Sequence, residues 1–401
     1  MGALEFLCDA RFHRSFLLRP NEAAGRSKPL RVSYADYGDR HSDAVVLVCG
    51  ALMATRFTYA TLDGLAKAFN VRIIHPNRPG IGGSDQVDLH QRIATWLEMV
   101  PQLLSHLGVS HIAVASHSGG VIYALNTILT YPQLLHPVTP YATFFAPWVH
   151  HSHSGVPHLR ATELLPATIV GRFAALVRFL NSNVAPIAGL STGLVHGIKE
   201  SLHHTIPDPA PLPVTPPNTM SRTASIASSC QRALLDIEDP KVVEELRRLI
   251  VEYLFAEGID GISDDAKLFL RKPTSLPWCS TKAVWSDFDD AVPLLSKMTK
   301  EGDDSALGAR KWRVDAFHAE TDHMVGEKGR EWFDNCWKLS HSTANSPGAD
   351  TEDQGMGWES LEYKSHVVPA SGHDYVMDPA FGAAERWLES VREAFPSPAE
   401  V

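Results

Sequence analysis

The first 150 residues alternate between short apolar runs and amphipathic stretches, and this alternation restricts the fold more than any other feature of the chain. Four runs are rich in β-branched or aromatic residues and end at turn residues, as buried parallel strands do: 44–50, 71–77, 111–118 and 141–147. The stretches with a helical pattern between them are 57–69, 90–108 and 119–132. Strands that alternate with helices form right-handed βαβ units, so we expect an α/β fold with a mostly parallel, doubly wound sheet.

Strand-like segments also precede and follow this region. Residues 12–20 and 30–38 predict two strands that are joined by a turn-rich segment. Residues 311–319 and 362–370 predict two more strands, and a closing helix is expected at 383–395.

The middle of the chain lacks strand signals. From 150 to about 280 the patterns are helical, at 168–181 and 241–258, apart from a Pro/Ser/Thr-rich connector at 205–229 that predicts a surface loop. We therefore predict a core that is interrupted by a helical cap, or lid. The predicted division is an N-terminal core segment (residues 1–149), the cap (residues 150–305) and a C-terminal core segment (residues 306–401).

Charge and cysteine content exclude several classes of function. The formal net charge of −10 argues against binding to nucleic acid or to an anionic membrane surface. The five cysteines are scattered without a C-x-x-C pair, so neither a zinc site nor a disulfide framework is indicated. No segment reaches the ~18 apolar residues of a membrane span, and the N-terminal sequence lacks the apolar run of a signal peptide. We expect a cytoplasmic protein without a membrane span.

A strand-to-helix turn at residues 114–120, VASHSGG, offers a nucleophile. A hydrolase nucleophile usually lies in Gly-x-Ser-x-Gly, and here Ser116 replaces the first glycine before Ser118, while Gly119 and Gly120 follow. Ser118 is expected at the carboxyl edge of the sheet and at the start of a helix, whose dipole favours developing negative charge. The alternative is a serine-rich turn without a catalytic role.

A serine nucleophile needs a base, and the base needs an acid that fixes its tautomer. His373 follows the last predicted strand and is the candidate base. Both Asp322, in AETDHMVG, and Asp289, in WSDFDDAVP, follow a plausible strand, so the local pattern leaves the acid open. The backbone N–H groups of Ala51, after the strand at 44–50, and of Gly119 are candidate donors of an oxyanion hole.

Together these motifs resemble the α/β-hydrolase superfamily, over residues 30–148 and 310–395. RPGIGGSD (78–85) resembles a Gly-rich turn of the superfamily, SGHD (371–374) its histidine loop, and AETDHMVG (319–326) its acid loop. Two positions depart from the pattern. Cys49 stands where the usual histidine precedes Gly50, and Ser116 stands for the first glycine of the elbow.

The resemblance implies a serine hydrolase with the triad order Ser, Asp, His along the chain. In this fold the acid strand directly precedes the histidine strand, and a strand at 311–319 after Asp289 would be surplus, so we favour Asp322. Ser118 is then expected to attack an acyl carbonyl and to form an acyl-enzyme, without a metal or an organic cofactor. The expected partner is a small to medium apolar ester, thioester or lactone, because the cap helices are apolar on one face.

Two other functions stay open. The same triad could serve acyl transfer or cyclisation in a biosynthetic pathway, or the fold could serve as a non-catalytic ligand-binding protein. Four residues near the turn and the cap are candidates for a pocket wall: Leu52, His117, Trp148 and His150. The segment HHSH (150–153) is expected to be a loop rather than a metal site, because it lacks carboxylates or cysteines at ligand spacing.

Overall fold

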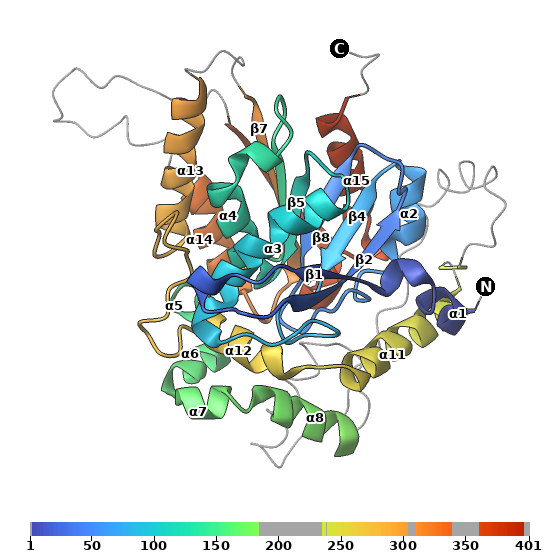
Figure 1. Cartoon of the computed structure of the whole chain (residues 1–401), viewed down its shortest axis with the longest axis horizontal. Coiled ribbons are helices and arrows are strands. Elements are labelled where there is room, and N and C mark those ends of the chain that lie inside the picture. The colour runs from blue at the N-terminus through green and yellow to red at the C-terminus, as the bar shows by residue number, and fades with distance from the viewer. Residues whose placement is uncertain (1, 184–234, 238, 304–309, 339–360, 397–401) are drawn as a thin grey trace, which may run out of the picture.

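Among the residues that the structure describes, eight strands form one sheet at the centre of the molecule (Figure 1). The computed structural model describes residues 2–183, 235–237, 239–303, 310–338 and 361–396. The strands are β1 (Arg14–Leu18), β2 (Leu30–Gly38), β3 (Val45–Cys49), β4 (Arg72–Pro76), β5 (Ala113–His117), β6 (Tyr141–Phe145), β7 (Trp312–Thr321) and β8 (Leu361–Gly372). Each of them overlaps a predicted strand.

The strand order is β1-β2-β4-β3-β5-β6-β7-β8. The pairs β1–β2 and β2–β4 are antiparallel, and all other neighbouring pairs are parallel. The short connection from β1 to β2 carries no crossover helix, so these two strands run in opposite directions at the edge of the sheet. The expected mostly parallel, doubly wound sheet is confirmed.

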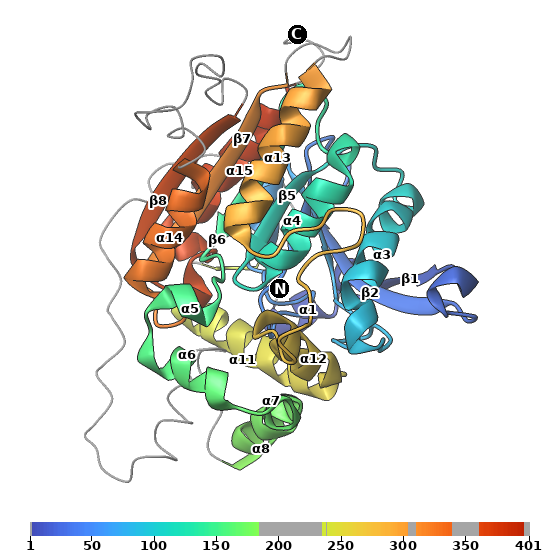
Figure 2. The same cartoon turned by 90° about the vertical axis from the view of Figure 1, so that its left-hand side faces the viewer.

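Helices cover both faces of the sheet (Figure 2). Strand residues alternate between two apolar layers, as the two-residue period of a strand requires. One layer packs against α3 (Arg92–His106), α4 (Gly120–Thr130) and α14 (Gly326–Lys338). The other packs against α1 (Ala3–Leu7), α2 (Leu62–Ala68) and α15 (Ala383–Ala394). The burial of every residue of β3, β5 and β6 explains why these strands read as continuous apolar runs.

The connection from β6 to β7 is long and helical. Its described helices are α5 (His151–Ser154), α6 (Pro157–Ala161), α7 (Ala167–Val170), α8 (Phe173–Asn183), α11 (Pro240–Ala256), α12 (Asp260–Phe269) and α13 (Phe288–Asp303). Both views show α6–α8, α11 and α12 at the same end of the sheet. By contrast α13 packs beside α4 and α14 in the first apolar layer. The division of the chain at residues 149 and 305 stays a prediction.

The helices of this connection differ in two places from those expected from the sequence. The segment expected as one helix at 168–181 is divided into α7 and α8 around Gly171, which caps the first helix. The segment HHSH (150–153), expected as a loop, overlaps the one-turn helix α5, which is capped by Gly155 in the left-handed conformation. The Pro/Ser/Thr-rich connector at 205–229 lies outside the described residues.

Among the described residues, none of the helices combines the length and the apolar character needed to cross a lipid bilayer.

Candidate active site

Ser118 lies directly after β5, in the turn that leads into α4. Its φ of +51° is in the left-handed region that residues with a Cβ rarely adopt. Three backbone hydrogen bonds hold this turn: Ser118 N–H donates to the Phe145 carbonyl at 2.9 Å, and the Ser118 carbonyl accepts from Val121 and Trp148. The constrained turn presents the Ser118 side chain at the carboxyl end of the sheet, as a nucleophile elbow does.

The two glycines after Ser118 are required by close packing. A Cβ on Gly120 would lie 2.0 Å from the Cys49 carbonyl oxygen at the end of β3. A Cβ on Gly119 would lie 2.1 Å from the ring of Phe269, the last residue of α12. The Phe269 ring of the β6–β7 connection therefore lies directly against the turn that carries Ser118.

The structure brings together Ser118, His373 and Asp322. The Ser118 Oγ and His373 Nε2 atoms are 2.8 Å apart, and His373 Nδ1 is 2.8 Å from Asp322 Oδ2. An ionised carboxylate only accepts hydrogen bonds, so His373 Nδ1 donates and a neutral His373 accepts the Ser118 proton at Nε2. All three side chains are nearly buried, with Ser118 7%, His373 4% and the Asp322 side chain 9% exposed. The arrangement has the hydrogen-bond order of a nucleophile, a base and an acid.

Electrostatics reinforce the pair of His373 and Asp322. Burial raises the pKa of Asp322, but His373 and the backbone N–H groups of Met324 and Val325 outweigh burial, so its pKa is lowered. Burial lowers the pKa of His373, but the Asp322 carboxylate, with a further contribution from Asp374, outweighs burial, so the pKa of the imidazole is raised above its ordinary value. The environment thus keeps Asp322 ionised and stabilises the imidazolium.

The competing acid candidate lies elsewhere. Asp289 is exposed in the first turn of α13, where its charge acts on the Cys336 thiol of α14. The carboxylate that contacts His373 belongs to Asp322.

Cys49, which stands in place of the usual histidine before Gly50, is fully buried at the end of β3. Burial raises the pKa of its thiol, which disfavours the reactive thiolate.

The backbone N–H of Ala51, a candidate donor of the oxyanion hole, makes a hydrogen bond within the protein that the sequence did not indicate. Its N–H donates to the Tyr59 hydroxyl at 3.1 Å. The Tyr59 hydroxyl is 2.9 Å from His117 Nδ1, and His117 Nε2 is 2.8 Å from the His373 carbonyl oxygen. A carbonyl only accepts, so His117 Nε2 donates, its Nδ1 accepts, and Tyr59 donates to it. Burial first, and then the nearby His373, lower the pKa of His117 to about 4, which keeps this ring neutral.

Tyr59→Phe is expected to lower the free energy of unfolding by about 2 kcal/mol, because it leaves His117 Nδ1 unpaired in the interior and removes the acceptor of the half-buried Ala51 N–H. Urea denaturation measures the change. Tyr131→Phe is the matched control, since the half-buried Tyr131 hydroxyl donates one hydrogen bond, to the Leu97 carbonyl, and its loss should cost about 1 kcal/mol or less. Equal losses in the two variants would contradict the proposed role of Tyr59 as a double partner.

The candidate wall residues are dispersed around this centre. His117 takes part in the hydrogen-bond chain from Tyr59 to His373. Trp148 is buried next to the turn, with its backbone N–H bonded to Ser118. Leu52 is partly buried between two apolar clusters, and His150 packs near Trp278. In the described portion of the chain, no three His, Cys, Asp or Glu side chains are grouped closely enough to hold a metal ion.

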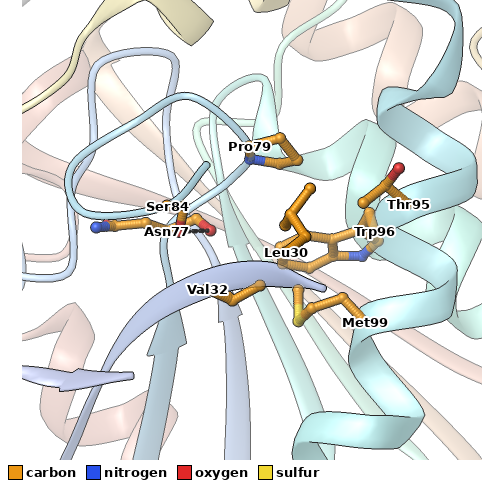
Figure 3. Close-up of a pocket in the computed structure, with 8 residues that line it drawn as sticks. All are labelled: Leu30, Val32, Asn77, Pro79, Ser84, Thr95, Trp96 and Met99. Carbon is orange, nitrogen blue, oxygen red and sulfur yellow. Dashed lines mark hydrogen bonds between the residues drawn. The ribbon is translucent and has the colours of Figure 1, made fainter. Parts of the chain in front are cut away.

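A small cavity lies to one side of the candidate site, between β2, the 78–85 turn and α3 (Figure 3). Its volume is about 10 Å³, the space of a single water molecule. The lining residues are Leu30, Val32, Asn77, Pro79, Ser84, Thr95, Trp96 and Met99. None of them belongs to the Ser118, His373 and Asp322 centre, so this cavity is a packing feature of the turn rather than a substrate site.

Comparison with known proteins identifies the fold. No protein-family model and no protein of curated function matches the chain significantly. Among solved structures, a bromoperoxidase from Bacillus anthracis aligns with a TM-score of 0.51 at 14% identity, over 94% of this chain and all of its own. An epoxide hydrolase from Vigna radiata aligns with a TM-score of 0.50 at 13% identity, over 96% of this chain and 98% of its own.

A thermophilic esterase from Thermogutta terrifontis also aligns with a TM-score of 0.50 at 13% identity, over 94% of this chain and 99% of its own. These similarities extend across nearly the whole chain at low identity, so they bear on the arrangement of the backbone. With the strand order and the turn after β5, they show that this chain has the α/β-hydrolase fold.

Proposed function

We propose that this chain is a serine hydrolase of the carboxylic ester hydrolase class, with Ser118 as nucleophile, His373 as base and Asp322 as acid. The observation that carries the proposal is the continuous hydrogen-bond chain from Ser118 Oγ through His373 to Asp322, with 2.8 Å at each step. The raised pKa of His373 supports it, because an imidazole beside an ionised carboxylate accepts a proton more readily.

In the proposed reaction, Ser118 Oγ attacks the acyl carbonyl carbon while His373 Nε2 takes the hydroxyl proton. The imidazolium then gives this proton to the leaving alcohol or thiol, and an acyl-enzyme remains on Ser118. Water attacks the acyl-enzyme as His373 takes its proton, and Ser118 Oγ leaves with that proton. The N–H of Gly119, at the start of α4 where helix N–H groups lack intrahelical acceptors, would stabilise the oxyanion together with an N–H of the loop after β3. We predict Ala51 as that second donor, and its N–H would exchange the Tyr59 hydroxyl for the oxyanion.

Apolar side chains around Ser118 support an apolar acyl group. Phe269 lies against Gly119, Trp148 is buried beside the turn, and Leu52 extends the apolar surface on the side of β3. A small to medium ester, thioester or lactone with an apolar acyl group is therefore the proposed substrate.

A fluorophosphonate probe is expected to label Ser118, with a rate that rises with pH. The base must be neutral to take the Ser118 proton, so the rate should increase through the pKa of His373, which lies above the ordinary value. Mass spectrometry of the labelled peptide identifies the residue, and the pH dependence of the labelling rate gives the midpoint. A protein that is labelled elsewhere, or not at all, would overturn the proposal.

Labelling alone leaves the acyl acceptor open. Product analysis with p-nitrophenyl butyrate in the presence of a competing alcohol distinguishes hydrolysis from acyl transfer. A hydrolase releases the free acid, while an acyltransferase makes a new ester with the alcohol. We expect the free acid as the main product.

A further inference from the structure

The guanidinium of Arg78 binds three consecutive carbonyl groups of the loop that follows β3. Arg78 Nη2 donates to the carbonyls of Ala51 at 2.7 Å and Leu52 at 3.0 Å, and Arg78 Nη1 donates to the carbonyl of Gly50. The side chain is only 2% exposed. Arg78 belongs to the Gly/Pro-rich turn after β4, so the turn of one strand fixes the loop of its neighbour.

This contact determines where the N–H groups of the loop point. In a trans peptide the N–H is directed opposite to the carbonyl of the preceding residue. Carbonyls that converge on Arg78 therefore direct the N–H groups of Ala51, Leu52 and Met53 away from it. The Ala51 N–H, which meets the Tyr59 hydroxyl in this structure, points away from Arg78 as this geometry requires. Cys49 pairs with Ser116, and both chains continue for two residues to the same edge of the sheet, where Ala51 and Ser118 lie. A cation on the carbonyl side also polarises each peptide and strengthens its N–H as a donor.

Arg78 is itself held by the β6–β7 connection. Arg78 Nε donates to Asp265 Oδ2 of α12 at 2.6 Å, while the Tyr123 hydroxyl of α4 and Arg92 Nε of α3 donate to Asp265 Oδ1 at 2.6 and 2.8 Å. Asp265 and Arg92 are fully buried. Burial raises the pKa of Asp265, but Arg92 and Arg78 outweigh it, so the carboxyl stays ionised. Asp265 precedes Phe269 by four residues, on the same face of α12.

We propose that Arg78 is a positioning residue for the oxyanion-stabilising N–H groups of the loop after β3, and that Asp265 of α12 holds Arg78 in place. This inference rests on the proposed function. It makes α12 a fixed component of the catalytic machinery, because the same face of the helix anchors Arg78 and places Phe269 over Gly119. The N–H geometry of the loop then depends on a residue of the β6–β7 connection, 187 positions away from Arg78 along the chain.

The test measures the inactivation of the full chain by a fluorophosphonate, whose phosphoryl oxygen occupies an oxyanion hole during attack. Arg78→Lys keeps the charge and loses the planar fork, so the maximal inactivation rate should fall about 10²-fold while the half-saturating probe concentration changes less than about threefold. The pH midpoint of inactivation should stay at the wild-type value, because His373 and Asp322 are untouched. Asp265→Asn should act in the same direction.

The matched control is Asp36→Asn. Asp36 is also fully buried and bound by Arg72, but at the opposite, amino end of β4. This variant should lose thermal stability like Asp265→Asn and keep the inactivation rate within about 1.5-fold of the wild-type value. Tyr123→Phe removes only one hydrogen bond to Asp265 and is the mildest variant. It should remain folded and lose about threefold in the maximal rate.

The outcomes separate the two proposals. If the wild-type protein is not labelled at Ser118, the proposed function falls and this inference falls with it. If the wild type is labelled but the folded Arg78 and Tyr123 variants keep its rate, only the positioning role is overturned. A shifted pH midpoint in these variants would also overturn it, because the effect would then act through His373.

Discussion

Replacing Ser118 by alanine is expected to lower kcat for p-nitrophenyl butyrate by about four or more orders of magnitude, while the protein stays folded. The change removes the Oγ atom that contacts His373 Nε2, and with it the atom proposed to form the acyl-enzyme. The backbone at φ +51° is no more strained for alanine than for serine, because both carry a Cβ. Its three backbone hydrogen bonds also remain.

Ser116→Ala is the matched control for this variant. Ser116 lies two residues earlier on β5 and is fully buried, and its hydroxyl has no hydrogen-bond partner among the described residues. Its removal should change kcat less than about tenfold. Circular dichroism and thermal denaturation establish that both variants are folded. A folded Ser118→Ala protein that loses less than tenfold would show that Ser118 is not the nucleophile.

The sheet was predictable because its central strands are buried on both faces. β3, β5 and β6 are entirely buried, so each appears in the sequence as an uninterrupted apolar run. The order of β3 and β4 in the sheet was not predictable from such runs, because a buried strand carries the same pattern whichever neighbour it pairs with. Helix boundaries in the β6–β7 connection were harder still, as the division between α7 and α8 shows.

The candidate triad could be predicted from position along the chain, since each member follows a recognisable strand. Ser118, Asp322 and His373 come after β5, β7 and β8, whose carboxyl ends lie at one edge of the sheet. The preference for Asp322 over Asp289 came from counting strands, and β7 is the strand that directly precedes Asp322. The catalytic roles themselves remain predictions.

The supporting contacts could not be predicted, because their partners are distant in sequence and carry no local signature. Tyr59 reaches His117 across 58 residues, and Arg78 reaches Asp265 across 187. An aspartate in DGISDDAKLF is typical of an exposed position, and a tyrosine in a predicted helical stretch does not show which residue its hydroxyl contacts. A buried carboxylate needs cationic partners, and only the folded chain shows that Arg78 and Arg92 supply them.

Asp322→Asn is expected to keep the fold and to lower kcat by up to ~10⁴, because the wrong tautomer of His373 would be stabilised. In the structure, Asp322 Oδ1 accepts hydrogen bonds from the N–H groups of Met324 and Val325, and Oδ2 faces His373 Nδ1. An asparagine keeps its oxygen on these two donors, so its NH₂ group faces Nδ1. His373 must then accept at Nδ1 and carry its proton at Nε2, where it cannot take the proton of Ser118.

Asp289→Asn provides the control, because Asp289 is exposed on α13 while His373 contacts Asp322. Its kcat should stay within about threefold of the wild-type value, as is usual for a surface carboxylate away from the reacting atoms. A second readout distinguishes lost chemistry from lost structure. Without the Asp322 charge the pKa of His373 should fall, so the pH midpoint of the residual activity should move to lower pH. A large loss in Asp289→Asn with little loss in Asp322→Asn would reverse the assignment and make Asp289 the acid.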